Sequence, residues 1–469
     1  MARSFVSRSL PVLVAASAIV FGCAKKPASE TTATANVESK GWTGDFDGML
    51  EHRNIRVLVP YSRSLYFVEN GKEHGLTADM AHDFETYLNQ KHASELGGRP
   101  ITVTLIPTTR DKLLPGLAAG KGDIAGGNLT ATASRMQTAD FVAPSELAPA
   151  EEVLVGGPGA PAVTNLTDLS GKKVNVRQAS SYFESLNALN DKFGSANKPA
   201  VKIVTMPDAL EDEDVLEMLN VGLFDFTVVD SWKAKLWAQT LPKIKVHDDI
   251  VLRSGGTIGW AIRKQSPKLQ AEIEGFYKVA SRQGLIEARL ANYRENLRKI
   301  SSSSTGPAMN RFGQTLTLFR KYGKQYPFDP LMLAAQGFKE SDLNETAKSH
   351  EAPGTGTQTP PVSGANLERN VQAGTRYIDQ LMARHFPDAK FSETDRTLFT
   401  FASYKAGPDN IARMREEAAK RGLDPNQWFN NVELVAAQEL GTETTTYVRN
   451  IFKYDVACEL IADADGGQK

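Results

Sequence analysis

Cysteine is scarce in this 469-residue chain, in which Cys23 and Cys458 are the only two. So few thiols exclude a disulfide framework and a thiolate metal cluster. The seven histidines are scattered, and neither a His-x-x-x-His nor a Cys-x-x-Cys motif occurs, so a structural zinc site is not expected. The sequence therefore predicts no metal and no cofactor.

An excess of either charge is also lacking. The chain has 54 Lys and Arg against 55 Asp and Glu, a formal net charge of −1, so nothing in the balance indicates a nucleic-acid partner. The hydrophobic fraction of 41% and the charged fraction of 23% are those of a soluble globular protein. A chain of this length exceeds one ordinary core, and two or three domains are expected.

The N-terminus has no apolar run long enough to cross a membrane. Its apolar segment, residues 10–21, follows Arg3 and Arg8 and ends just before Cys23. About a dozen apolar residues suit a signal peptide, because a spanning helix needs about twenty. A secretory signal with an incidental cysteine is one interpretation of this pattern.

The Gly22-Cys23 junction resembles the lipobox of bacterial lipoproteins, although Phe21 stands where a small residue is usual. The resemblance implies a signal peptide over residues 1–22, lipidation of Cys23 and, with Ala24 next, an outer-membrane lipoprotein that faces the periplasm of a Gram-negative bacterium. Residues 23–44 are rich in Ala, Thr, Ser, Glu and Lys without an apolar period, which predicts a flexible tether.

From residue 45 to residue 300, strand and helix patterns alternate. The predicted strands are residues 55–59, 101–107, 123–127, 174–176, 201–206, 226–230 and 256–263. The predicted helices are residues 76–88, 113–119, 182–189 and 212–219, with two more in 264–297. This order predicts parallel sheets with crossover helices in two lobes, the last strand returning to the first lobe.

A Ser- and Gly-rich junction at 301–307 is the best domain boundary in the chain. Beyond it, in residues 308–469, strand patterns give way to helical spacing. The expected helices are residues 312–322, 367–382, 397–403, 410–419 and 445–454. The predicted architecture is thus a two-lobed α/β domain followed by an all-α domain of ordinary size.

Three segments in the first lobe carry a family resemblance, residues 75–80, 120–123 and 128–135, and the second lobe adds residues 180–182 and Asp230. They resemble the extracellular solute-binding proteins of family 3, the amino-acid type, which implies a two-lobed periplasmic-binding-protein-like fold. Residues 61–64 stand where that family often has an aromatic platform.

The resemblance implies that Arg135 pairs with a ligand carboxylate and that Asp230 takes the ligand amine, helped by Thr130 and Ser181. A guanidinium fork suits a carboxylate, and a helix beginning at Ser180 would offer free N–H groups. The alternative is that Arg135 makes a structural ion pair and that the cleft is empty or has another use.

In the all-α domain, an apolar helical face in residues 331–338 leads to Glu340 and Ser341. A carboxyl group held against apolar surface has a raised pKa and can act as a general acid. Taken alone, a solvated glutamate at a helix end is the simpler interpretation.

Four groups of residues change that preference: Glu340-Ser341, Asn370 with Gly374, residues 402–408, and Glu443-Thr444 with Tyr447. Their order resembles the lysozyme-like soluble lytic transglycosylase domain, and a solute-binding domain followed by this domain is a known layout of membrane-bound lytic transglycosylases. These enzymes cleave the MurNAc-β-1,4-GlcNAc bond of peptidoglycan and leave a 1,6-anhydroMurNAc end.

The resemblance implies that Glu340 is the catalytic acid, oriented by Tyr404 and assisted by Ser341. For Tyr404 a core aromatic with a satisfied hydroxyl is the alternative. The substrate-binding residues it implies are Gln358, Lys405, Asn370 and Tyr447. The implied partners are peptidoglycan glycan strands, an amino acid or muropeptide effector in the first domain, and the membrane through the lipid anchor.

Two departures from the family pattern concern the acid. The loop 351–361 is rich in Gly, Pro and Thr where the family has an apolar turn, and Lys405 replaces an asparagine. Lower burial and a nearby cation both favour the ionised form of Glu340 and would reduce its strength as an acid catalyst. A non-catalytic murein-binding or sensing lipoprotein is therefore the rival hypothesis.

Overall fold

The computed structural model describes residues 42–69, 71–144, 149–299, 376 and 379–466. The chain divides into two compact units, Met1–Ala35 and Asn36–Lys469, and every described residue belongs to the second. The predicted signal peptide and the junction 301–307 lie outside the described residues.

The first lobe is built on the parallel strands β4 (Thr102–Thr108), β1 (Asn54–Pro60) and β5 (Ile124–Ala131). β1 is buried along almost its whole length, as expected for a strand covered on both faces. Short elements complete the lobe: β2 (Phe67–Glu69), β3 (Lys72–His74), β6 (Ala139–Val142), α1 (Phe46–His52), α3 (Ala93–Leu96) and η1 (Arg135–Gln137). Its longer helices are α2 (Leu76–Lys91), α4 (Arg110–Ala118), α8 (Pro267–Arg282) and α9 (Leu285–Lys299).

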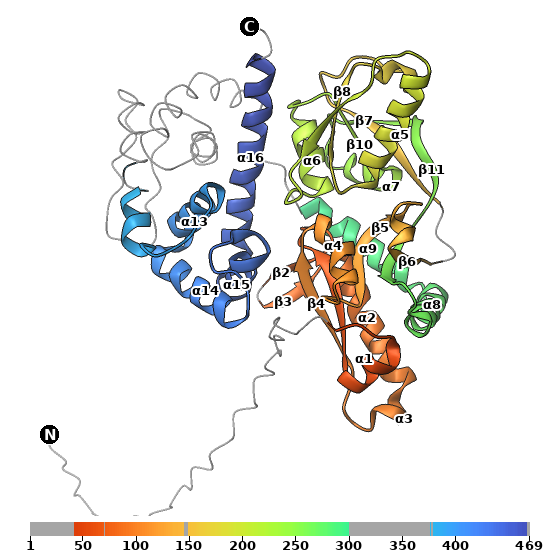
Figure 1. Ribbon diagram of the computed structural model, residues 1–469, viewed down its shortest axis with the longest axis vertical. Helices are drawn as coiled ribbons and strands as arrows, with labels where there is room; N and C mark the ends of the chain where they lie inside the picture. The colour runs from red at the N-terminus through yellow and green to blue at the C-terminus, as the bar shows by residue number, and fades with distance from the viewer. Residues whose placement is uncertain (1–41, 70, 145–148, 300–375, 377–378, 467–469) are drawn as a thin grey trace, which may run out of the picture. The chain divides into compact units, whose positions relative to one another are not determined.

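The second lobe has the parallel strands β10 (Phe226–Asp230), β8 (Lys173–Arg177) and β9 (Lys202–Met206), with β7 (Ala150–Gly156) antiparallel to β10. Its helices are α5 (Ser181–Ser195), α6 (Asp212–Asn220), α7 (Ser231–Trp237) and the short η2 (Leu166–Leu169). Figure 1 shows these elements in yellow and green.

The strand β11 (Lys245–Arg263) belongs to both lobes. Its first part pairs antiparallel with β7, and its last part pairs antiparallel with β5 and β6. Near the end of the first part, Gly255 has a φ of 79°, which a residue with a Cβ adopts only with strain. The predicted return to the first lobe and the predicted parallel strands in both lobes are confirmed, but antiparallel strands not predicted from the sequence join them. Both sheets are mixed, because β7 and β11 run against their neighbours.

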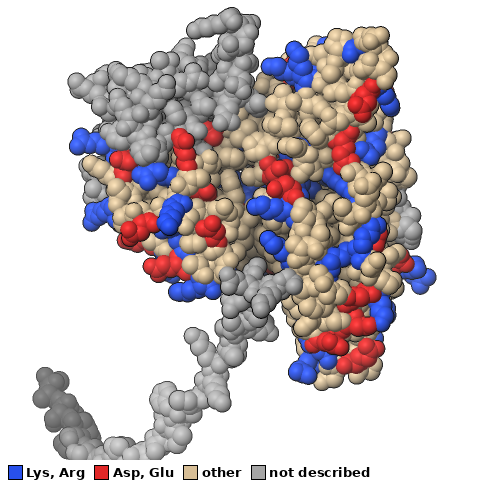
Figure 2. Space-filling model, viewed as in Figure 1, with Lys and Arg blue, Asp and Glu red and all other residues tan. Residues whose placement is uncertain are grey.

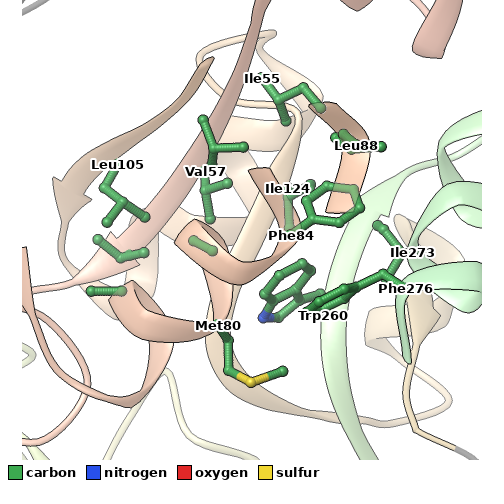
Figure 3. Packing of buried hydrophobic residues seen from close by; sticks show 14 of the residues in the cluster. Ile55, Val57, Met80, Phe84, Leu88, Leu105, Ile124, Trp260, Ile273 and Phe276 are labelled. Atoms are coloured by element: carbon green, nitrogen blue, oxygen red, sulfur yellow. The ribbon is translucent and has the colours of Figure 1, made fainter. Parts of the chain in front are cut away.

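Aromatic side chains form the core of the first lobe, where α2 and α8 meet β11 (Figure 3). The ring of Trp260 lies 5.6 Å from that of Phe84 and 6.1 Å from that of Phe276, and all three residues are almost completely buried. This cluster fixes β11 against the lobe that it re-enters.

Residues 42–44, which the sequence assigns to the tether, pack on the first lobe. The backbone N–H of Trp42 donates to the carbonyl of Gly120 at 3.1 Å, and Arg56 donates to the carbonyl of Trp42 at 2.8 Å. Trp42 is therefore part of the folded domain.

The regular elements in the described part of the C-terminal region are all helices, as predicted. Residues 379–385 are followed by α13 (Glu393–Ala406), α14 (Pro408–Lys420), the turn η3 (Trp428–Val432), α15 (Glu433–Leu440) and α16 (Thr442–Gly466). Ser392 caps α13 by accepting from the N–H of Asp395, and Gly407, with a φ of 88°, ends it. A core around the fully buried Trp428 and Phe399 joins these helices.

Basic and acidic side chains are interspersed over the face shown in Figure 2, in keeping with the balanced composition. Within the described ranges, every helix is too short or too polar to cross a bilayer.

Candidate functional site

Four residues of the predicted transglycosylase site, Glu340, Ser341, Gln358 and Asn370, lie outside the described residues, as does the lipidation candidate Cys23. The other three, Tyr404, Lys405 and Tyr447, are described. They come from α13 and α16, two helices that pack against each other.

Tyr404 and Lys405 occupy the last turn of α13. Tyr404 is half-buried and packs on the helical core. The ammonium of Lys405 lies 2.6 Å from the carboxylate of Glu443 and 5.9 Å from the ring centroid of Tyr447. The fold thus brings together two of the segments, 402–408 and 443–447, that carry the transglycosylase resemblance.

The predicted solute-binding residues are also brought together, at the junction of the two lobes. Thr130 lies at the buried end of β5, and Arg135 follows it in η1. Ser181 begins α5, whose cap Ser180 accepts from the N–H of Phe183 at 3.2 Å. Asp230 ends β10 and is 1% exposed.

Arg135 contacts groups of both lobes. Its guanidinium donates to the carbonyl of Thr130 at 3.1 Å and to that of Ala179, on the second lobe, at 2.8 Å. Its Nε lies 3.3 Å from the carboxylate of Glu184 on α5. In this conformation Arg135 makes the structural ion pair that was the alternative expectation from the sequence.

Asp230 faces a buried lysine on the next helix turn. The ammonium of Lys233 lies 3.0 Å from Oδ2 of Asp230 and 2.6 Å from Oδ2 of Asp212. Burial alone would lower the pKa of Lys233, but the two carboxylates raise it, so the lysine stays charged. The other oxygen of Asp230, Oδ1, is buried, and none of the described groups donates a hydrogen bond to it.

Three charged residues of this site were not predicted from the sequence: Arg110, Arg177 and Glu211. Arg110 starts α4 in the first lobe, Arg177 ends β8 in the second, and both guanidinium groups contact the carboxylate of Glu211. The feature of the sequence that could have identified them is their position, since charged residues at strand ends and helix starts gather at the same edge of an α/β sheet.

The tyrosine of the expected aromatic platform, Tyr61, is covered by a cation. The guanidinium of Arg449, from α16, lies 4.6 Å from the ring centroid of Tyr61 and donates to the carbonyl of Ala209 at 3.1 Å. Arg449 also pairs with the fully buried Glu433 of α15 at 2.5 Å. Burial is the main cause that raises the pKa of Tyr61 to about 12.

A metal-binding arrangement of three or more His, Cys, Asp or Glu side chains does not occur among the residues that the structure describes. The charged groups at the lobe junction pair with one another instead.

Two lobes joined by a shared antiparallel strand, with charged groups at their junction, define the class of two-lobed solute-binding proteins. Residues 55–296 match the family described as bacterial extracellular solute-binding proteins, family 3. The match covers more than half of the chain, and the chain belongs to this family.

The relatives extend beyond that domain. A membrane-bound lytic murein transglycosylase F of Desulfosudis oleivorans is 25% identical over 429 residues, which are 86% of this chain and 89% of the relative. A relative of the same name from Ectopseudomonas mendocina is 25% identical over 434 residues, 85% of this chain and 83% of its own length.

Two solved structures are similar to about half of this chain. An ancestral arginine-binding protein bound to arginine matches 51% of this chain and 97% of its own, with 24% identity and a TM-score of 0.42. An amino acid ABC transporter substrate-binding protein from Streptococcus pneumoniae bound to L-arginine matches 54% and 98%, with 17% identity and a TM-score of 0.44.

Proposed function

We propose that the protein is a lytic transglycosylase that cleaves the MurNAc-β-1,4-GlcNAc bond of peptidoglycan and forms a 1,6-anhydroMurNAc end. One observation carries the proposal: a relative named membrane-bound lytic murein transglycosylase F aligns over 86% of this chain, and so over both of its domains. A transport receptor alone leaves the helical domain without a role.

In the proposed reaction one carboxyl group acts twice. Glu340 gives its proton to the leaving glycosidic oxygen as the bond to the anomeric carbon breaks. The sugar's own 6-hydroxyl oxygen then bonds to that carbon, and its proton returns to the Glu340 carboxylate, so water is not consumed. Hydrolytic glycosidases commonly use two carboxylates for their chemistry.

The other residues have supporting roles in this proposal. Tyr404 orients Glu340 by a hydrogen bond, and Ser341 polarises the substrate or stabilises the helix end. The glycan strand is bound by Gln358, Lys405, Asn370 and Tyr447. The contact of Lys405 with Glu443 and the Tyr447 ring supports placing both on one side of the site.

We further propose that the first domain binds an amino acid or muropeptide at the lobe junction and regulates cleavage. Arg135 and Thr130 would hold the ligand carboxylate, and Ser181 and Asp230 the rest of its polar end. The unpaired Oδ1 of Asp230 supports this assignment, since a buried carboxylate oxygen without a described donor suits a ligand ammonium.

A lipid on Cys23 would anchor the protein to the outer membrane, facing the periplasm. This part of the proposal rests on the Gly22-Cys23 junction in the sequence, and mass analysis of the mature N-terminus tests it.

Digestion of purified murein sacculi followed by mass analysis tests the enzymatic proposal. We expect the full-length protein to release anhydro-ended muropeptides and the Glu340→Gln variant to release none above background. Equal, background release by both proteins would contradict the proposal and favour the rival, a murein-binding lipoprotein.

A further inference from the structure

The acidic start of α6 lies between the two lobes of the solute-binding domain. The carboxylate of Glu211 accepts two hydrogen bonds from Arg110, at 2.7 Å from Nη2 and 2.9 Å from Nε, and one from Arg177 at 3.1 Å. Arg110 belongs to the first lobe, whereas Arg177 and Glu211 belong to the second. One buried carboxylate therefore bridges the lobes through two guanidinium groups, the arrangement that recognises carboxylate ligands.

The next acidic residues of α6 also reach the first lobe. The hydroxyl groups of Ser62 and Ser64 donate to the two oxygens of Glu213, at 2.7 Å and 3.2 Å. Arg63 lies between them in sequence, and its guanidinium pairs with Glu217 at 3.0 Å. These bonds join residues about 150 positions apart in the chain.

Two of the residues assigned to a solute, Arg135 and Asp230, are engaged in the same conformation. Arg135 is bonded to Ala179 and Glu184, and Oδ2 of Asp230 is paired with Lys233. The exception in the described part is Oδ1 of Asp230, which is buried without a donor. The lobes are thus held together by side chains of the protein itself, and Oδ1 of Asp230 is an acceptor that these contacts do not use.

We propose that residues 211–214 are an internal occupant of the lobe junction: they close the two lobes in the absence of solute, and an incoming amino acid must displace them. Glu211 satisfies Arg110 and Arg177. Arg135, the cation assigned to the ligand carboxylate, is held by Glu184 and by the carbonyls of Thr130 and Ala179. The second half of this proposal rests on the solute site proposed above. The first half, closure without solute, does not.

Internal occupation lowers the apparent affinity for a solute. A ligand that binds only the displaced state has its affinity reduced by the small fraction of molecules in that state. Removing the carboxylate that bridges the lobes should therefore strengthen binding, whereas removing an ordinary ligand-contacting residue should weaken it.

Hydrogen–deuterium exchange of the full-length protein without solute tests the first half. We expect strong protection of residues 62–66 and 211–216, and exchange at least about tenfold faster in both segments of Glu211→Gln. Arg110→Gln removes the same bridge from the other lobe and gives a second variant. Asp248→Asn, which breaks the exposed pair with Lys235, is the control and keeps the wild-type pattern. Rapid exchange of both segments in the wild-type protein would overturn the proposal.

Calorimetric titration with the common L-amino acids tests the second half. We expect Glu211→Gln to bind at least one of them about tenfold or more tightly than the wild-type protein does, and Arg135→Ala to abolish that gain. Tight binding by the wild type that Glu211→Gln weakens would overturn the internal occupant. Protected segments with no binding by any variant would support closure by α6 and contradict the amino-acid part of the proposed function.

Discussion

Tyr404 allows the proposed chemistry to be tested by the removal of a single hydroxyl group. It lies half-buried in the last turn of α13, so Tyr404→Phe keeps the ring in the core. We expect unchanged thermal unfolding and a release of anhydro-ended muropeptides that is about tenfold slower or more, the effect of losing one hydrogen bond to a charged partner. An unchanged rate on sacculi would assign Tyr404 to the core alone.

Substitution of Lys405 tests whether its positive charge affects the pKa of the candidate acid, Glu340. Its ion pair with Glu443 is solvent-exposed, 35% and 80% for the two side chains, so Lys405→Asn should change stability by no more than about 0.5 kcal/mol. Removing a cation raises the pKa of a nearby carboxyl group. Because Glu340 must be protonated to act as the acid, we expect the basic limb of the pH profile of the cleavage rate to move to higher pH in Lys405→Asn.

The matched control for Lys405→Asn is Lys420→Asn, at the exposed end of α14, where Lys420 pairs with Glu417. It should leave the pH profile of cleavage in place. Identical profiles for the wild type and both variants would separate Lys405 from the chemistry of Glu340.

At the scale of elements, helix α6 makes folding sensitive to pH through Glu213. Burial raises the pKa of Glu213 from its ordinary 4.5 to about 7, neighbouring carboxylates add to the rise, and Arg63 opposes it. Between these two pH values the folded chain holds a proton that the unfolded chain has lost. Stability contributed by this group is therefore present at low pH and falls as pH rises toward 7, by up to about 3 kcal/mol.

We expect Glu213→Gln to flatten this dependence and to be more stable than the wild type above about pH 7. The measurement is the urea midpoint of the full chain at a series of pH values. Glu151→Gln, at an exposed position of β7, is the control and keeps the wild-type slope. If the urea midpoint of the wild type does not decrease as the pH rises from about 5 to about 7, Glu213 is not protonated in the folded chain.

Helix α2 is held to the first lobe by Phe84, which is fully buried against Trp260 and Phe276. Phe84→Ala should cost about 3–5 kcal/mol, the usual range for deleting a buried aromatic ring. Met136→Ala is the matched control, because its side chain is 48% exposed and should cost under about 0.5 kcal/mol. Urea unfolding followed by tryptophan fluorescence measures the free energy of unfolding of both variants. Similar decreases in the two variants would contradict the placement of Phe84 in the core.

The elements that the sequence predicted are those with continuous apolar runs or clear helical spacing, such as β1, β10 and α5. The missed strand β7 is buried except at Glu151. It was not predicted because two charged residues, Glu151 and the buried Glu152, interrupt its apolar run. Its antiparallel pairing with β10 depends on the chain crossing between lobes, and no local pattern encodes that. Short β2, β3 and β6 gave too few residues for a period to be visible.

For the candidate site, family resemblance placed Arg135 and Asp230 at the lobe junction, but their partners could not be predicted. The run Glu211-Asp212-Glu213-Asp214 is typical of a solvated first helix turn, where acidic residues favour the helix dipole. Only the folded chain shows that it is mostly buried and faces Arg110, Arg177 and Ser62. Burial of charge depends on long-range pairing, which a single sequence does not reveal.

At the scale of the whole molecule, Arg449 combines contacts to three parts of the chain. It pairs with Glu433 of the helical region, donates to Ala209 of the second lobe and covers Tyr61 of the first. A single charged residue with three such partners should matter more to stability than its surface exposure suggests. Its partner Glu433 is fully buried, so water cannot replace the guanidinium of Arg449 as the partner of the Glu433 carboxylate.

Arg449→Ala should therefore destabilise the protein by about 3–5 kcal/mol, because it leaves the Glu433 carboxylate buried without its cation. Glu433→Gln in the same chain should recover part of the loss, since the buried charge is then gone. Arg421→Ala, which removes partly exposed ion pairs with Glu417 and Glu439, is the control and should cost no more than about 1 kcal/mol. Urea titrations of five proteins, namely the wild type, Arg449→Ala, Glu433→Gln, the double variant and Arg421→Ala, measure the coupling. Losses that simply add in the double variant would show that Arg449 acts through packing alone.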